Sequence, residues 1–134
     1  MIMADTSVWI DYFNGTQNRH TIKLDNLLVN DIVVIGDIIL AEILQGFRLD
    51  RDFIRAKVTL DVLECFPIVG KENAIKSAEN FRFLRKKGIT VRKTTDMLIG
   101  TFCITNNIPL LYSDRDFDPL KENLGLRAVL QNLY

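Results

Sequence analysis

Residues 32–44 read IVVIGDIILAEIL, and this segment determines which class of fold the chain can adopt. Its first part, Ile32-Val33-Val34-Ile35, is a run of β-branched residues that Gly36 ends. A short continuous apolar run suits a strand that is covered on both faces, as in a parallel sheet. Asp37 then opens a strongly apolar segment that predicts a helix to about residue 49. A buried strand followed directly by an apolar helix is typical of α/β folds.

The alternation of strand and helix continues on both sides of this segment. We expect further strands at residues 2–5, 66–69, 110–112 and 126–130, and further helices at 7–13, 21–30, 51–65, 72–87 and about 94–106. This order implies an α/β fold with a mostly parallel central sheet of about four to five strands. With 134 residues and 48% hydrophobic composition, residues 1–134 are expected to form a single domain.

Apolar spacing predicts which side chains the helices bury. Ile22 is expected to face the core from the helix at 21–30, and Ile54 and Val58 from the helix at 51–65. Both cysteines, Cys65 and Cys103, lie in segments that read as apolar helix, which favours reduced core residues. The chain has no export signal and no apolar run near the roughly 20 residues of a spanning helix. We therefore expect a cytoplasmic protein.

Charge is balanced overall but uneven along the chain. The sequence has 17 basic and 17 acidic residues, which argues against a generally basic nucleic-acid-binding protein. From residue 80 to residue 95, however, there is no acid and there are six cations: Arg82, Arg85, Lys86, Lys87, Arg92 and Lys93. Such a stretch is either a solvated helix face or a surface that holds a polyanion.

Four acidic positions lie in segments that should otherwise carry no charge. Asp5 ends the apolar opening of the chain, Glu42 interrupts an apolar helix, Asp96 opens another, and Asp114 follows an apolar strand with Asp116 beside it. An ionised carboxylate in an apolar setting costs several kcal/mol unless it is paired or bound to a metal. Four such positions indicate a metal-ion site.

Simpler explanations exist for some of these acids individually. Asp5 could cap the first helix, and Asp96 in a first helical turn is favoured by the helix macrodipole without any metal. Glu42 has no basic residue three or four positions away, so it is the hardest to explain without a metal. Gln45 and Gly46 share its side of the helix, which leaves open a narrow polar strip on the helix surface instead of a pocket.

The predicted topology brings the acids together. In open parallel sheets the reactive crevice lies beyond the carboxyl ends of the strands, where Asp5 and Asp114 are expected. Asp96 and Glu42, near the starts of their helices, are expected close to the same rim. Clustered carboxylates of this kind select Mg²⁺ or Mn²⁺, which points to phosphodiester hydrolysis. Beside them, the hydroxyl groups of Thr6 and Ser7 could hold a water or a phosphate.

Four segments in this order resemble the PIN-domain nucleases and, within them, the VapC-type toxins of toxin–antitoxin systems. They are DTSVWI at 5–10, AEILQG at 41–46, TDMLIG at 95–100 and LYSDRDF at 111–117. The resemblance covers essentially the whole chain. It implies a PIN-like three-layer α/β/α sandwich and a Mg²⁺- or Mn²⁺-dependent endoribonuclease. It also implies a cytoplasmic protein, often a homodimer, held inactive by a cognate antitoxin whose C-terminal segment wraps the active-site groove.

The resemblance also assigns roles to residues. It implies metal ligands and catalytic acids at Asp5, Glu42 and Asp96, with Asp114 or Asp116 as the fourth acid. On an extended segment these last two would share a face, so either or both could reach the metal, and we favour Asp114 as the one nearer the strand end. The cations at 82, 85, 86, 92 and 93, already named, are then the candidate RNA contacts.

Other functions fit only parts of this pattern. A haloacid-dehalogenase-type phosphatase also begins with a strand that ends in aspartate, but it needs a second acid two residues later, where this chain has Ser7. A Toprim-type nuclease uses an Asp-x-Asp pair such as residues 114–116, but it needs a glutamate at the first strand end, where this chain has Asp5. The remaining alternative is a catalytically inactive PIN-fold module that binds RNA or protein, which would not need all four acids.

Overall fold

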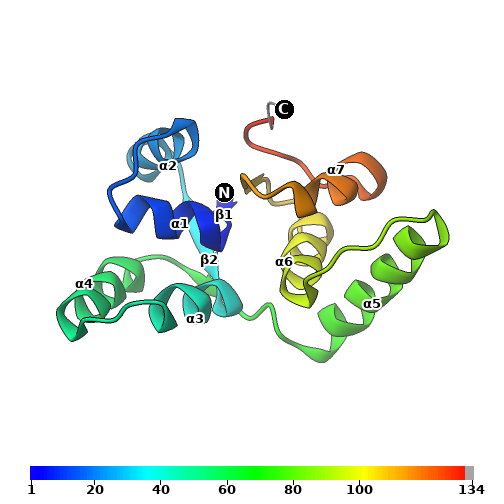
Figure 1. Ribbon diagram of the computed structural model, residues 1–134, viewed down its shortest axis with the longest axis horizontal. Coiled ribbons are helices and arrows are strands. Elements are labelled where there is room, and N and C mark those ends of the chain that lie inside the picture. The colour runs from blue at the N-terminus through cyan, green and yellow to red at the C-terminus, as the bar shows by residue number, and fades with distance from the viewer. Residues whose placement is uncertain (132–134) are drawn as a thin grey trace.

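A computed structural model describes residues 1–131, and these form an α/β structure built on a parallel sheet (Figure 1). Its strands and helices, in chain order, are β1 (Ile2–Ala4), α1 (Thr6–Phe13), α2 (Arg19–Asn30), β2 (Val33–Gly36), α3 (Asp37–Gln45), α4 (Asp50–Asp61), β3 (Cys65–Phe66), α5 (Lys71–Lys86), α6 (Thr94–Thr105), β4 (Leu110–Leu111), the 3₁₀ turn η1 (Arg115–Phe117) and α7 (Asp118–Leu124).

The sheet has four strands in the order β3-β2-β1-β4, and every pairing is parallel. Met3 of β1 is central, because it lies opposite Val34 of β2 on one side and Leu110 of β4 on the other. The segment expected as a fifth strand forms no strand of its own and contributes one parallel bridge, in which Ala128 pairs with Leu110 of β4. The expected α/β class with a mostly parallel sheet is therefore confirmed.

Helices cover both faces of the sheet, which gives three layers (Figure 1). Helices α1 to α4 connect β1, β2 and β3 and lie on one side, where α1 packs against both α2 and α3, and α3 packs against α4. Helices α5, α6 and α7 pack together on the other side. The chain moves outward from β1 to β3 and then returns across the sheet to β4. Right-handed connections then place the two sets of helices on opposite faces.

The core is formed by the strands and the helix faces against them. Met3, Val34, Ile35 and Leu110 are almost completely buried, and Cys103 of α6 is buried as expected. A close approach between α6 and α7 depends on Gly100, because a Cβ atom there would collide with Leu120. This approach holds the segment after β4 against α6.

Several details expected along the second quarter of the chain are wrong. Helix α4 ends at Asp61, so Cys65 lies in the edge strand β3 and is exposed. Ile54 and Val58 are also exposed, because α4 turns Ala56 and Leu60 toward the core instead. The helix carries apolar residues on both sides, so its spacing alone does not define which side is buried.

Ile22 of α2 is a further exposed residue that spacing assigned to the core, whereas Leu24 and Leu27 of that helix are buried.

Among residues 1–131, none of the helices combines the length and the apolar character needed to cross a membrane.

Candidate metal centre

The candidate site lies at the carboxyl ends of β1 and β4, two adjacent strands whose connections lead to opposite faces of the sheet. Asp5 follows β1, whose connection leads to α1 on one face, and Asp114 follows β4, whose connection leads through η1 to α7 on the other face. Adjacent parallel strands whose connections diverge leave a crevice at their carboxyl ends. Two of the predicted acids therefore lie at the edge of the sheet where open parallel folds bind their ligands.

Three aspartates form a compact group on the α6 side of this crevice. One carboxylate oxygen from each of Asp96, Asp114 and Asp116 lies within 4.8 Å of the others. Asp96 comes from the first turn of α6, and the other two come from the segment after β4. A group of this size, made of hard oxygen atoms, matches the ligand preference of Mg²⁺ and Mn²⁺.

A tight turn brings Asp114 and Asp116 together. Asp114 caps η1, and its Oδ1 accepts a hydrogen bond of 2.9 Å from the backbone N–H of Asp116. The expected extended conformation of this segment is therefore wrong, although both side chains reach the group as that expectation required. The two residues differ in their structural role, because Asp114 uses Oδ1 to cap the turn and has only Oδ2 left for other contacts.

Asp5 and Asp96 are the two buried members of the site. They are 4% and 6% exposed. Burial raises the pKa of Asp5 to about 6, partly offset by hydrogen bonds that include one of 3.0 Å from Ser7 Oγ to Asp5 Oδ2. Burial, followed by the charge of Asp5, raises the pKa of Asp96 to about 7. Both shifts follow mainly from burial, and at Asp96 the positive charge of Lys93 offsets the rise only in part.

Asp96 has a further unmet requirement. Its Oδ2 atom is buried and has no hydrogen-bond partner among the described residues. A buried carboxylate oxygen without a partner is costly, and in native proteins it usually has a functional explanation. A cation bound by Asp96, Asp114 and Asp116 would satisfy this atom, so the donor set fits a divalent metal.

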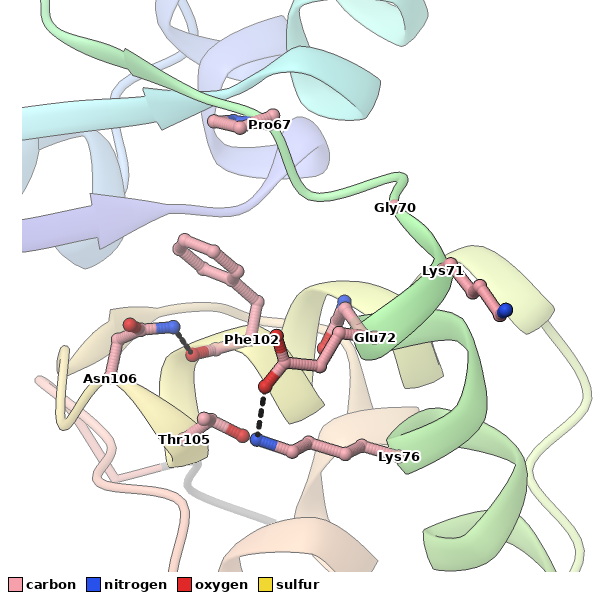
Figure 2. A pocket seen from close by; sticks show the side chains of 9 residues that line it. Pro67, Gly70, Lys71, Glu72, Lys76, Phe102, Thr105 and Asn106 are labelled. Carbon is pink, nitrogen blue, oxygen red and sulfur yellow. Dashed lines mark hydrogen bonds and ion pairs between the residues drawn. The ribbon is translucent and has the colours of Figure 1, made fainter.

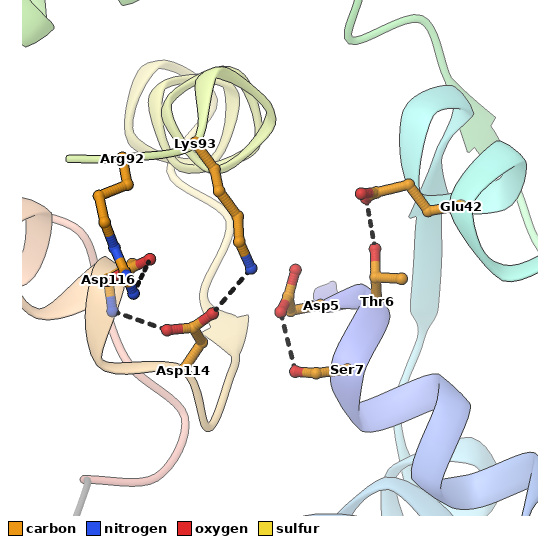
Figure 3. A network of polar contacts seen from close by, with 8 residues as sticks. All are labelled: Asp5, Thr6, Ser7, Glu42, Arg92, Lys93, Asp114 and Asp116. Carbon is orange, nitrogen blue, oxygen red and sulfur yellow. Dashed lines mark hydrogen bonds and ion pairs between the residues drawn. The ribbon is translucent and has the colours of Figure 1, made fainter.

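Glu42 lies on the opposite wall of the crevice. Thr6 Oγ1 donates a 2.7 Å hydrogen bond to Glu42 Oε1, and Figure 3 shows Asp5 between this pair and the turn that carries Asp114 and Asp116. The charge of Glu42 contributes to the raised pKa of Asp5. Glu42 is thus linked to the site through Thr6 and Asp5, but it is outside the compact group of three aspartates.

Two cations on the loop before α6 contact the acids. Lys93 Nζ lies 3.5 Å from Asp114 Oδ2, and Arg92 Nη2 lies 3.7 Å from Asp116 Oδ2. The negative charge of Asp96, and then of Asp114, raises the pKa of Lys93. Figure 3 shows the Lys93 side chain extending between the acidic turn and Asp5. These ion pairs were not expected from the sequence, which suggested RNA contacts at both positions.

The other predicted residues are distributed over two regions. Thr6 and Ser7, expected to position water or phosphate, bind Glu42 and Asp5 directly. The cations of α5, at positions 82, 85 and 86, are exposed and lie outside the acidic group. A pair of basic residues immediately before a helix that opens with an acid is the sequence signal that could have indicated the Arg92 and Lys93 contacts.

A separate cavity of about 320 Å³ lies at the far end of α6 from Asp96 (Figure 2). Its wall includes Phe102 and Asn106 of that end, and an ion pair of 3.3 Å between Lys76 and Glu72 of α5. None of the predicted site residues lines it. The acidic crevice is therefore the site to which the sequence and the structure both point.

The geometry can be compared with known proteins. The family model for the PIN domain matches residues 2–123. The chain belongs to the PIN domain family. VapC ribonuclease Mb1587 of Mycobacterium bovis is 30% identical over 135 residues, covering 96% of this chain and 98% of that protein. Ribonuclease VapC11 of Mycobacterium tuberculosis matches to the same extent.

Solved structures confirm the PIN fold. VapBC2 from Rickettsia felis, bound to a DNA fragment from its promoter, contains a chain with a TM-score of 0.76 and 22% identity, and the match covers 100% of both chains. VapBC-1 from nontypeable Haemophilus influenzae has a TM-score of 0.73 and 20% identity, over 98% of each chain. The resemblance to VapC-type PIN domains is thus confirmed over essentially the whole PIN domain of this chain.

Proposed function

We propose that this PIN domain is a Mg²⁺- or Mn²⁺-dependent endoribonuclease, the toxin of a toxin–antitoxin pair, and that residues 1–134 act as one catalytic domain. The observation that carries the proposal is the buried Asp96 Oδ2 atom, which lacks a hydrogen-bond partner among the described residues although Asp96 belongs to a group of three carboxylates. The 30% identity to VapC ribonucleases supports the choice of RNA as substrate.

Each acid has a distinct part in this proposal. Asp96 and Asp114 would hold the cation with Asp5, and Asp116 would complete the group from the η1 turn. Glu42, fixed by the Thr6 hydroxyl, would orient a water or a ligand from the opposite wall. When bound, the divalent cation lowers the pKa of a water molecule and offsets the charge that develops on the phosphoryl oxygens.

Ser7 would orient a metal ligand, and the two cations of the loop before α6 would bind the substrate. The Ser7 hydroxyl keeps Asp5 in one orientation through its 3.0 Å hydrogen bond. Arg92 and Lys93 are 81% and 58% exposed, so they can exchange their aspartate partners for RNA phosphates when a metal takes over the acids. The cations at 82, 85 and 86 on α5 would then extend the phosphate contacts.

An antitoxin is the expected protein partner. The similar solved structures include VapBC complexes and a toxin–antitoxin complex from Klebsiella pneumoniae. On this chain, the outer face of α4 is apolar and exposed, with Phe53, Ile54 and Val58 on the helix and Leu49 and Val62 at its ends. We propose that an apolar antitoxin segment covers this face in the cytoplasm, and that the toxin itself pairs as a homodimer.

One observation favours a second candidate function. Asp114 and Asp116 are already paired with Lys93 and Arg92, so part of the acidic charge is neutralised without a metal. A catalytically inactive PIN-fold module that binds RNA or protein would have this arrangement. It leaves the buried Asp96 Oδ2 atom unexplained, so the nuclease is the better supported function.

The experiment that separates the two functions is the mapping of cut sites on total cellular RNA incubated with the purified chain. With Mn²⁺ or Mg²⁺, a nuclease gives discrete new 5′ ends that disappear with EDTA and with Asp96→Asn. Asp61→Asn, an exposed change on α4, is the matched control and should cleave normally. If the wild-type chain binds RNA but produces no metal-dependent ends, the inactive module is correct.

A further inference from the structure

A second cavity, of about 620 Å³, lies between α5, the start of α6 and the loop that joins them. Its wall is largely apolar, with Val69 from the segment after β3, Ala78 and Phe81 from α5, and Met97 and Leu98 from α6. None of the candidate metal-binding acids lines this groove, so it is distinct from the carboxylate group. An apolar groove of this size is large enough to take a planar ring system.

The charge of this groove is one-sided. Arg82, Arg85 and Arg92 contribute to its wall, and no aspartate or glutamate does. This holds although the chain has equal numbers of acidic and basic residues. Three guanidinium groups beside an apolar wall match a ligand that is both planar and anionic. A nucleotide has these two properties, because its base is apolar on its faces and its phosphate is charged.

Phe81 provides an aromatic surface in the groove. Its ring is half-buried, and the guanidinium carbon of Arg85 lies 5.6 Å from the ring centroid. Single-stranded nucleic acid is commonly bound on aromatic rings next to arginine, because every base can stack and every phosphate can pair with a cation.

The groove is connected to the acidic crevice through Arg92. This residue lines the groove, and its Nη2 atom lies 3.7 Å from Asp116 Oδ2. Thr94 and Met97, which also line the groove, flank Asp96 in the first turn of α6. The groove and the carboxylate group therefore share Arg92 and the first turn of α6.

We propose that this groove is a nucleotide subsite, which takes an unpaired RNA base next to the cleaved bond against Phe81 while Arg82 and Arg85 bind its phosphates. The subsite rests on the proposed ribonuclease function and adds to it a binding place for the nucleotide beside the cleaved bond. A second copy of this chain or an apolar peptide would bury the apolar wall but would leave three arginines without anionic partners.

The test uses the full-length Asp5→Asn chain, so that RNA is bound without being cut. Affinity for fluorescent single-stranded 12-nucleotide RNAs is measured by anisotropy, and an RNA with 4-thiouridine is photo-crosslinked and mapped by mass spectrometry. We expect crosslinks to the peptide that contains Phe81. Ala78→Leu, which fills the groove from an exposed position, should weaken binding about tenfold, and so should Arg82→Gln. Lys57→Ala on α4 removes an exposed charge outside the groove and should leave affinity within twofold.

Three outcomes overturn the subsite. Ala78→Leu could bind RNA as tightly as its parent, or crosslinks could fall only outside the groove. Alternatively, Ala78→Leu could change the sedimentation of the protein while leaving RNA affinity unchanged, which would assign the groove to a second copy. Position-specific crosslinks with no cleavage by the wild-type chain would instead support the subsite and refute the nuclease function, so the two failures are distinguishable.

Discussion

Replacing Asp5 by asparagine should stabilise the metal-free protein at pH 8, although it removes a proposed metal ligand. The side chain is 4% exposed, and burial raises its pKa from 3.8 to about 6. Asparagine keeps the shape of the side chain and can accept the hydrogen bond from Ser7, but it carries no charge. The variant therefore removes the cost of ionising a buried carboxyl group while keeping the local packing.

The sign and size of the effect follow from the two pKa values. The unfolded chain releases this proton near pH 4 and the folded chain near pH 6, so the free energy of unfolding falls as the pH rises between them. The rise from 3.8 to about 6 corresponds to a destabilisation of about 3 kcal/mol, which is fully present above about pH 7 and absent below about pH 3. The raised pKa of Asp96 adds a loss in the same direction.

Urea denaturation followed by circular dichroism in EDTA measures this effect. At pH 5 part of the cost is already present, so the gap between Asp5→Asn and the wild type should widen by about 1.4 kcal/mol from pH 5 to pH 8. Asp61→Asn, an exposed change, should stay within about 0.5 kcal/mol of the wild type at both pH values. A gap that does not change with pH, or a variant less stable than the wild type at pH 8, would refute the reasoning.

Three further outcomes are expected. Mn²⁺ at about one hundred times its dissociation constant should stabilise the wild type by about 2.7 kcal/mol in thermal melts, and Asp96→Asn should lose most of this gain. Arg85→Ala and Lys86→Ala should weaken RNA binding and reduce the slope of log affinity against log salt by about one unit for each lost phosphate contact; unchanged slopes would make α5 a solvated face. Ile54→Lys combined with Val58→Lys should abolish co-purification of this chain with a co-expressed candidate antitoxin, with little change in stability, because both residues are exposed.

The elements that carry the site could be predicted from the sequence because their signals are local. The β-branched run of β2 and the apolar helix after it indicated the α/β class, and Asp5 and Asp114 were expected at strand ends, where the structure has them. Glu42 was recognised as an acid without a basic partner nearby on its helix, and in the structure it accepts a hydrogen bond from the neutral Thr6 hydroxyl.

Features that depend on tertiary packing could not be predicted. Helix α4 has apolar residues on two sides, and contact with α3 selects Ala56 and Leu60 rather than Ile54 and Val58 for burial. Lys93 lies far from Asp114 along the chain, so only the folded structure reveals their ion pair. Strand β3, which contains the exposed Cys65, has two residues and is too short to produce a periodic pattern of apolar residues in the sequence.

The metal site is tested most directly by the rate at which the purified chain cleaves a mapped RNA site under single-turnover conditions in saturating Mn²⁺. Asp5→Asn should reduce this rate by about a thousandfold or more, which corresponds to about 4 kcal/mol of lost transition-state stabilisation. Asp61→Asn should cleave at the wild-type rate. Cleavage by correctly folded Asp5→Asn at the rate of the wild type would contradict a carboxylate metal site in this crevice.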